Sequence, residues 1–306
     1  MPQTLRLGTR ASRLALVQAE LVRAALATTG AACEIVPLKT SGDRIQDRSL
    51  ADAGGKGLFT KELEDALLRG EIDLAVHSMK DVPTALPQGL VIAALLPRED
   101  PREAFLSLKA KDVTGLPKGA RVGTSSVRRQ AQLLRARPDL QPVLLRGNVD
   151  TRIAKLDAGE FDAMLLALAG LKRLGLEARA TALLDTDHWL PSLAQGAIGI
   201  EVRGDDADTR ATIATLNDAP TEIALSCERA FQAALDGTCR TSIAGLATVS
   251  GNTLKFRGEV LAPKGDGYVD TSLEIALGSD PVREAAAAGE EAGLDLKPDA
   301  AEWLVV

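Results

Sequence analysis

Aromatic residues and histidine are scarce in this sequence. Phe, Trp and Tyr make up 3% of the 306 residues, and there are two histidines. A surface that stacks nucleic-acid bases needs aromatic side chains, and nucleic-acid-binding proteins usually carry an excess of positive charge. Because the formal net charge here is −6, the composition argues against a nucleic-acid partner.

Cysteine is also rare, and no long apolar run is present. Cys33, Cys227 and Cys239 are odd in number and far apart, which predicts neither a disulfide framework nor a metal site. No segment approaches the roughly 20 apolar residues that span a bilayer, and the first residues lack the apolar core of a signal peptide. These absences predict a cytoplasmic protein with no membrane partner.

Strand and helix signals alternate along the first half of the chain. This alternation predicts the α/β class, with mostly parallel sheets covered by helices. Residues 198–202 predict one more strand, which could return to the first sheet. Beyond a helix at about 219–235, three antiparallel strands and a helix from about residue 281 predict a small α+β domain. The strands predicted in the first half are 5–9, 33–38, 72–76, 121–123, 142–145 and 161–166.

Arginine is concentrated in one segment of this acidic chain. Seven arginines but only two acids, Asp139 and Asp150, lie from Arg121 to Arg152. The segment contains GTSSVRR at a predicted helix start, where hydroxyl and backbone N–H groups bind anions. An ordinary serine cap followed by solvated arginines is the alternative. We favour anion binding, because arginine recurs in the next strand–helix unit and pairs well with carboxylates.

Two further segments carry candidate reactive groups. HSMKDVP follows a buried strand and would direct Lys80 and Asp81 into a cleft, unless they form an ordinary surface ion pair. His77 is interpreted as a structural residue. Cys239 lies in a polar turn beside Arg240, which favours a reactive thiolate, whereas Cys33 and Cys227 are predicted core residues. Residues 40–57 predict a long polar loop of the kind that forms lids.

Seven segments of the sequence together are typical of one family. In this order they resemble the porphobilinogen deaminases over essentially the whole chain, and their joint presence is far more specific than any one of them. The segments are RLGTRASRLAL, GGKGLFTKELE, AVHSMKDVP, VGTSSVRRQAQL, LLRGNVDTRIAKL, LAQGAIGIE and DGTCRTSIAG.

The resemblance implies three domains and a monomer. The first two domains are expected to be similar to the lobes of periplasmic binding proteins, hinged around a cleft. Domain 1 would comprise residues 1–98 and about 197–216, with the lid loop at 40–57. Domain 2 would comprise 99–196 and bind anions, and domain 3, residues 217–306, would carry the cofactor attachment.

The resemblance also implies a reaction and a cofactor. The enzyme would join four porphobilinogen molecules head to tail and release ammonia, after which water would free hydroxymethylbilane. The implied cofactor is dipyrromethane, made from two porphobilinogens and held by a thioether to Cys239. Each pyrrole carries an acetate and a propionate, which would explain the arginine cluster.

The family motifs place a role on fourteen positions. Asp81 matches the catalytic aspartate, which would stabilise the cationic methylene-pyrrole left by loss of ammonia. Cys239, Lys80, Asp81, Thr124, Ser125, Ser126, Arg128, Arg129 and Gly147 match cofactor-binding positions. Arg10, Ser12, Arg146, Arg152 and Gln195 match substrate-binding positions.

A non-catalytic two-lobed anion-binding protein is the alternative. Such a protein would require neither Cys239 nor Asp81 nor a third domain. Arg13 and Asp52 depart from the family pattern, because proline is common at position 13 and a lysine can occur at position 52, so no binding role is placed on Asp52.

Overall fold

The computed structural model describes residues 4–44, 57–238 and 240–304. Cys239, Asp52 and most of the predicted lid loop lie outside the described residues. The chain forms two compact units, each of which is treated by itself. Among the described residues, the first unit contains 4–44, 57–99 and 196–222, and the second contains 100–195 and 223–304. The division into a second domain at 99–196 and a third domain at 217–306 stays a prediction.

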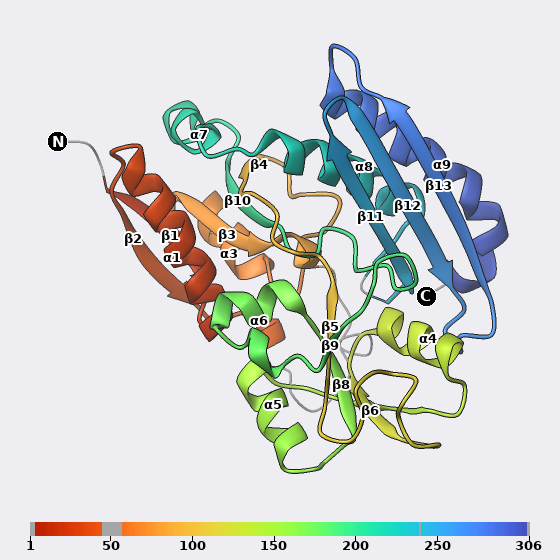
Figure 1. Ribbon diagram of the computed structural model, residues 1–306. Helices are drawn as coiled ribbons and strands as arrows, with labels where there is room; N and C mark the ends of the chain where they lie inside the picture. The colour runs from red at the N-terminus through yellow and green to blue at the C-terminus, as the bar shows by residue number, and fades with distance from the viewer. Residues whose placement is uncertain (1–3, 45–56, 239, 305–306) are drawn as a thin grey trace. The chain divides into compact units, whose positions relative to one another are not determined.

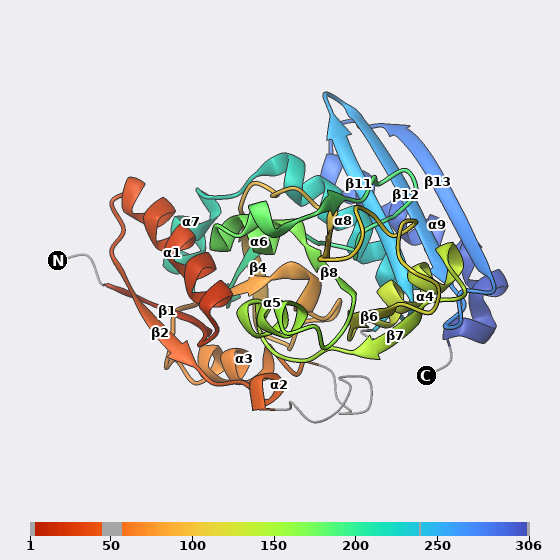
Figure 2. The ribbon, with the colours of Figure 1, turned by 60° about the horizontal axis from the view of Figure 1, so that its bottom comes forward.

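A five-stranded sheet forms the centre of the first unit (Figures 1 and 2). The strand order is β2-β1-β3-β10-β4, and only β10 runs against the others. The predicted return of residues 198–202 to this sheet is therefore confirmed. The elements are β1 (Leu5–Arg10), α1 (Arg13–Thr28), β2 (Cys33–Leu38), α2 (Ser41–Arg44), α3 (Lys61–Leu68), β3 (Leu74–Ser78), the 3₁₀ turn Met79–Asp81, β4 (Leu90–Leu95), β10 (Ile198–Arg203) and α7 (Ala207–Ala214).

Helices cover both faces of this sheet because its strands are apolar on both faces. Val22 of α1 and Ile213 of α7 pack on one face with Leu7 and Val76. On the other face, Ala75 packs with the apolar side of α3. Ser12 caps the first helix, since its Oγ accepts a hydrogen bond from the Ala15 N–H.

The second unit contains a five-stranded sheet of the same plan. Its order is β7-β6-β8-β5-β9, and only β5 runs against the others. Helices α5 and α6 pack on one face and α4 packs on the other. The elements are β5 (Glu103–Ser107), β6 (Arg121–Thr124), α4 (Val127–Ala136), β7 (Gln141–Leu144), α5 (Val149–Asp157), β8 (Ala163–Ala167), α6 (Leu168–Leu174), the 3₁₀ turn Glu177–Arg179 and β9 (Ala182–Leu183).

The rest of the second unit is an antiparallel sheet covered by two helices (Figure 1). Strands β11 (Ile243–Ser250), β12 (Thr253–Leu261) and β13 (Tyr268–Ala276) pair in sequence order. Helices α8 (Ala219–Ala234) and α9 (Pro281–Leu304) pack against its apolar side chains, with Phe231 and Phe256 at the centre. Because side chains alternate along a strand, the charged residues of β12 lie on the opposite face.

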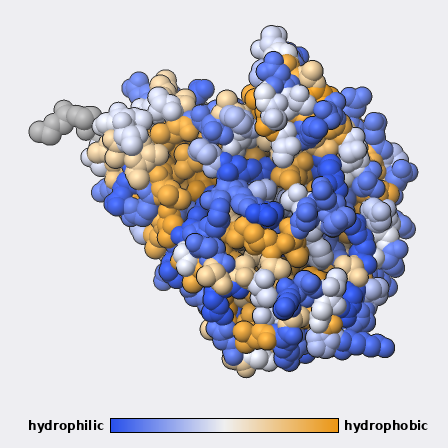
Figure 3. Space-filling model, in the orientation of Figure 1, coloured by the Kyte–Doolittle hydropathy of each residue, from blue (hydrophilic) through white to orange (hydrophobic). Residues whose placement is uncertain are grey.

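The α/β class with two helix-covered sheets and a small C-terminal domain is thus confirmed. The structure adds β4, β5, α6 and α7, which apolar periodicity did not predict, because short apolar runs fit a strand or a helix equally well. One face of the molecule shows hydrophobic patches separated by hydrophilic side chains, which is ordinary for a folded protein (Figure 3). In the described ranges, no helix is long and apolar enough to cross a membrane.

The close approach of α8 and α9 predicts an effect of substitution at Gly289. A Cβ at this position would lie 2.1 Å from the backbone oxygen of Cys227, so Gly289→Ala must push the two helices apart. We expect a loss of about 1–3 kcal/mol in the free energy of unfolding, as for other overpacked sites. Denaturant titration measures it, with Glu290→Ala on the exposed side of α9 as control; equal stability of the two variants would contradict the packing.

Candidate functional site

In the first unit, Lys80 and Asp81 lie on the 3₁₀ turn that follows β3. The turn is fixed at its base, because the Met79 N–H donates to the Ala197 oxygen at 3.1 Å and the Met79 side chain is buried. A Cβ at Gly199 would lie 2.1 Å from the Met79 sulfur, so a larger residue there would displace the buried Met79 side chain. Lys80 is exposed and Asp81 is partly exposed, as the two predicted site residues require.

Arg10 lies beside Asp81. Its Nη1 is 3.8 Å from the Asp81 Oδ2, and its guanidinium lies over the Phe59 ring at 4.1 Å from the ring centre. An arginine stacked on an aromatic ring is held by the negative face of the ring. The structure therefore brings together two predicted site residues, one anionic and one cationic, at the end of β1 and β3. Ser12 follows in the chain as the cap of α1.

His77 is a structural residue, in agreement with its interpretation from the sequence. It is buried, and its Nε2 lies 2.9 Å from the Oε2 of Glu201, which is also buried. Glu64 of α3 is near enough to interact with both, and burial raises the pKa of Glu64. This polar cluster lies inside the fold below the turn that carries Asp81.

In the second unit, two predicted anion-binding segments meet at one edge of the sheet. β6 and β7 are parallel neighbours, with Thr124 opposite Leu144 and the Leu145 N–H donating to the Thr124 oxygen at 3.2 Å. GTSSVRR and RGNVDTR therefore follow adjacent strand ends, as the sequence pattern predicts for parallel strands. Each segment also begins a helix, α4 or α5.

Several predicted binding residues hold the local turns at this edge. The Ser126 N–H donates to the Thr124 Oγ1 at 3.1 Å, and the Ser126 Oγ caps α4 by accepting from the Arg129 N–H. Gly147 has a φ of 110°, a conformation that favours glycine. Its carbonyl oxygen accepts a hydrogen bond from the Arg152 Nε at 2.8 Å. The edge is thus fixed before any ligand arrives.

Arg128 and Arg129 are not solvated, which overturns the alternative interpretation of these arginines. They are 4% and 7% exposed, and both pair with Glu103, which is 0% exposed. Arg128 Nη2 lies 2.6 Å from one carboxylate oxygen and Arg129 Nη2 lies 2.7 Å from the other. Burial lowers the pKa of Arg128 against the opposing effect of Glu103.

Three other predicted site residues of the second unit differ in exposure. Ser125 and Arg146 are partly exposed, and burial lowers the pKa of the Arg146 guanidinium. Gln195 is fully buried, and its Nε2 donates to the Pro101 oxygen at 2.8 Å. The role of Gln195 toward the substrate stays a prediction.

The residues on both sides of Cys239 form a hydrogen-bonded turn. The Thr238 N–H donates to the Thr241 Oγ1 at 2.9 Å, and that hydroxyl donates to the Thr238 oxygen at 2.8 Å. The Arg240 N–H donates to the Thr238 Oγ1. Although Cys239 itself lies outside the described residues, its neighbours are held in a compact loop after α8.

Two functional candidates have no role assigned from the sequence. Phe59 supports Arg10 by stacking, and Glu103 joins Arg128 to Arg129. In the sequence, Glu103 directly precedes the apolar run AFL of a buried strand. Because a buried carboxylate needs a partner of opposite charge, this position indicates that Glu103 forms an ion pair. Phe59 follows the glycine cluster, and nothing in the sequence indicates which side chain it contacts.

Comparisons with known proteins agree on one family. The family model "Porphobilinogen deaminase, dipyromethane cofactor binding domain" matches residues 5–211. The model "Porphobilinogen deaminase, C-terminal domain" matches residues 223–298. The porphobilinogen deaminase of Nitrobacter hamburgensis is 53% identical over 91% of this chain and 91% of its own length. That of Nitrobacter winogradskyi is 51% identical over 97% and 93%.

Solved structures show weaker likenesses. A periplasmic substrate-binding protein of an ABC transporter from Coxiella burnetii is 16% identical, with a TM-score of 0.45, covering 71% of this chain and 93% of that one. A methionine-binding protein is 16% identical, with a TM-score of 0.44, covering 70% and 89%. The matches to the two family models and to the relatives span nearly the whole chain. The chain belongs to the porphobilinogen deaminase family, and dipyrromethane is the cofactor of that family.

Proposed function

We propose that this chain joins four porphobilinogen molecules head to tail on a dipyrromethane primer, with release of ammonia and then of hydroxymethylbilane. It is thereby a transferase of tetrapyrrole and heme biosynthesis. The observation that carries the proposal is the identity of 51–53% to porphobilinogen deaminases over more than nine-tenths of the chain. A non-catalytic anion-binding protein is not favoured, because it would need neither Asp81 nor Cys239.

The donor groups of the second unit fit a cofactor that carries carboxylates. One edge of its sheet collects the hydroxyls of Thr124, Ser125 and Ser126 and the first turns of α4 and α5. Guanidinium groups and helix N-termini both stabilise negative charge. Dipyrromethane, when bound, supplies the pyrrole position to which the first substrate is joined. The cofactor-binding roles of Arg128, Arg129 and Gly147 rest on the same fit, and that of Lys80 rests on its place beside Asp81 on the turn of the first unit.

The substrate-binding roles belong to groups with similar chemistry. Arg10 and Ser12 lie at the end of β1, and Arg10 lies beside Asp81. Arg146 and Arg152 lie at the end of β7 and the start of α5. Each condensation adds an acetate and a propionate to the product, so the need for cations grows with chain length. Arginine offers two parallel N–H donors to each carboxylate, which suits this task better than lysine.

Asp81 is proposed to act on the reacting carbon and nitrogen atoms. A carboxylate stabilises the positive charge that develops when ammonia leaves the substrate. It can also hold the pyrrole N–H and transfer a proton during coupling. The position of Asp81 supports this proposal, since its turn is fixed from below while its carboxylate stays partly exposed beside Arg10.

Cys239 is proposed to hold the primer by a thioether. The two described cysteines are poor nucleophiles, which supports this assignment. Cys227 is fully buried, and burial raises the pKa of its thiol to about 12. Burial also raises the pKa of Cys33. A thioether requires attack by a thiolate, and raised pKa values suppress that form.

The chain is further proposed to act as a monomer in the cytoplasm, without a nucleic-acid or membrane partner. Its net charge of −6 and its low aromatic content support the absence of a nucleic-acid partner. The wide spacing of the three cysteines is typical of a protein in a reducing compartment.

Replacement of Asp81 tests the proposed catalytic role. Asp81→Asn keeps the shape of the side chain and removes its charge, so turnover of porphobilinogen should fall by at least about a hundredfold while the fold persists. Product formation and circular dichroism measure the two effects. Asp205→Asn, at an exposed carboxylate of the same unit, should leave turnover unchanged. Near-normal turnover of Asp81→Asn would assign the chemistry to another group.

The thiol of Cys227 should resist alkylation in the folded protein. With a pKa of about 12, only about one molecule in ten thousand carries the thiolate at pH 8, and burial blocks access of the reagent. Iodoacetamide treatment followed by peptide mass analysis should therefore show Cys227 modified only after unfolding, and Cys33 modified slowly before it. Rapid modification of native Cys227 would remove one support for the assignment of Cys239.

A further inference from the structure

One buried carboxylate serves two neighbouring arginines of the second unit. Glu103 begins β5 on the face that packs against α4, as the alternation with Phe105 requires. Its Oε1 accepts from Arg128 Nη2 at 2.6 Å, and its Oε2 accepts from Arg129 Nη2 at 2.7 Å. The Arg129 Nε also donates to Oε1 at 3.2 Å. Glu103 therefore fixes the orientation of both guanidinium groups.

A second contact holds Arg128 from the other side. The Gln132 Oε1 accepts from Arg128 Nη1 at 2.8 Å, while the Gln132 Nε2 donates to the Glu259 Oε1 and to the Leu190 oxygen. The orientation of this amide is unambiguous, because its NH₂ group faces two acceptors and its oxygen faces a donor. The network thus runs from β5 through α4 to β12.

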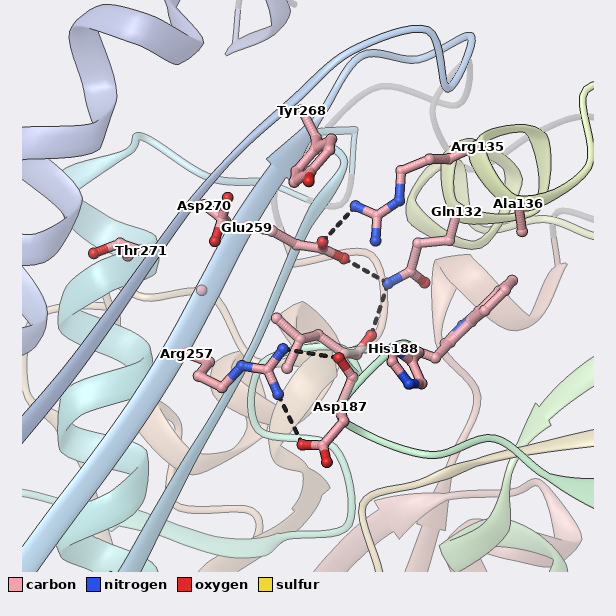
Figure 4. A pocket seen from close by; sticks show the side chains of 13 residues that line it. Gln132, Arg135, Ala136, Asp187, His188, Arg257, Glu259, Tyr268, Asp270 and Thr271 are labelled. Carbon is pink, nitrogen blue, oxygen red and sulfur yellow. Dashed lines mark hydrogen bonds and ion pairs between the residues drawn. The ribbon is translucent and has the colours of Figure 1, made fainter.

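Glu259 is itself held in place at the far end of this network. Figure 4 shows it between Gln132 and Arg135, whose Nη1 lies 2.8 Å from the Glu259 Oε2. Arg135 in turn lies over the Tyr268 ring at 4.3 Å from the ring centre. These side chains are among those that line a cavity of about 410 Å³. Arg135 thus pairs with Glu259, while Arg128 and Arg129 pair with Glu103.

The charge balance of the network favours an anion. Three guanidinium groups, those of Arg128, Arg129 and Arg135, pair with the two carboxylates of Glu103 and Glu259, so arginines outnumber carboxylates among these ion pairs. Arg128 and Arg129 also lie in the first turn of α4, where the helix dipole disfavours cations and favours anions. A ligand carboxylate at this helix start would compensate both effects.

We propose that Glu103 is a positioning residue that holds Arg128 and Arg129 for the carboxylates of the cofactor. This inference rests on the proposed function. Glu103 lies on a strand hydrogen-bonded on both sides, to β8 and β9, so its carboxylate is a rigid reference point for the two side chains. Donor groups that are already oriented bind an anion without the entropy cost of ordering those donors at the moment of binding.

Glu103→Asp tests the inference. The substitution keeps the charge but shortens the side chain by one methylene, so the carboxylate no longer reaches both guanidinium groups. Uptake of covalent pyrrole mass from porphobilinogen by folded full-length protein produced without its primer, followed by intact-mass spectrometry, should slow about tenfold or more. Glu103→Gln, which removes the charge, should slow uptake further and lower the midpoint of thermal unfolding.

Asp73 in the first unit provides a matched control. It is also a buried carboxylate between two arginines, 2.7 Å from Arg6 Nη2 and 3.6 Å from Arg203 Nη2. Asp73→Asn should lower the midpoint of thermal unfolding, as Glu103→Gln does, but its folded fraction should load at the wild-type rate. Wild-type loading of folded Glu103→Asp would overturn the inference, as would equal slowing by Asp73→Asn. Wild-type protein that is produced without its primer and never gains mass would instead overturn the proposed function.

Discussion

The arrangement of charge in the second unit depends on the carboxylate of Glu103. Two consecutive arginines at the start of a helix oppose both each other and the helix dipole, and a buried cation without a partner is costly. Glu103 removes that cost by pairing with both. Its place on β5 in turn requires the chain to enter this sheet against the direction of the other strands. The two buried ion pairs therefore depend on the reversed direction of β5.

The first unit has a sheet of the same topology, and its reversed strand also supports a candidate site residue. Its reversed strand, β10, lies between β3 and β4 and supports the turn of Asp81 through the contacts of Met79 with Ala197 and Gly199. Within the described residues, β5 follows the passage of the chain from the first unit to the second at residues 99–100, and β10 follows its return at residues 195–196. In each unit the reversed strand thus anchors candidate site residues, Asp81 in one and Arg128 and Arg129 in the other. In both units the candidate site residues lie on short turns or helix starts that directly follow a strand of the sheet.

The sequence predicts those features that are set by local chemistry. The parallel strands and the place of the two arginine-containing segments at neighbouring strand ends are confirmed. The pairing of Glu103 with Arg128 is not predictable in this way, because the two residues are 25 positions apart and only the sheet order brings them together. The same reason applies to His77 and Glu201, which meet across β3 and β10. The alternative interpretation predicts that Arg128 and Arg129 are exposed, because charged residues near a helix start usually face solvent. They are buried instead, because Glu103 of β5 pairs with both.

The central claim is that the sulfur of Cys239 holds the pyrrole primer near cationic groups that bind its acids. Peptide mapping of the purified native protein tests it most directly, because cleavage after arginine and lysine separates the three cysteines into different peptides. We expect the added mass on the peptide AFQAALDGTCR, residues 230–240, and unmodified peptides for Cys33 and Cys227. An adduct on either of those two cysteines, or an active protein without any adduct, would contradict the account.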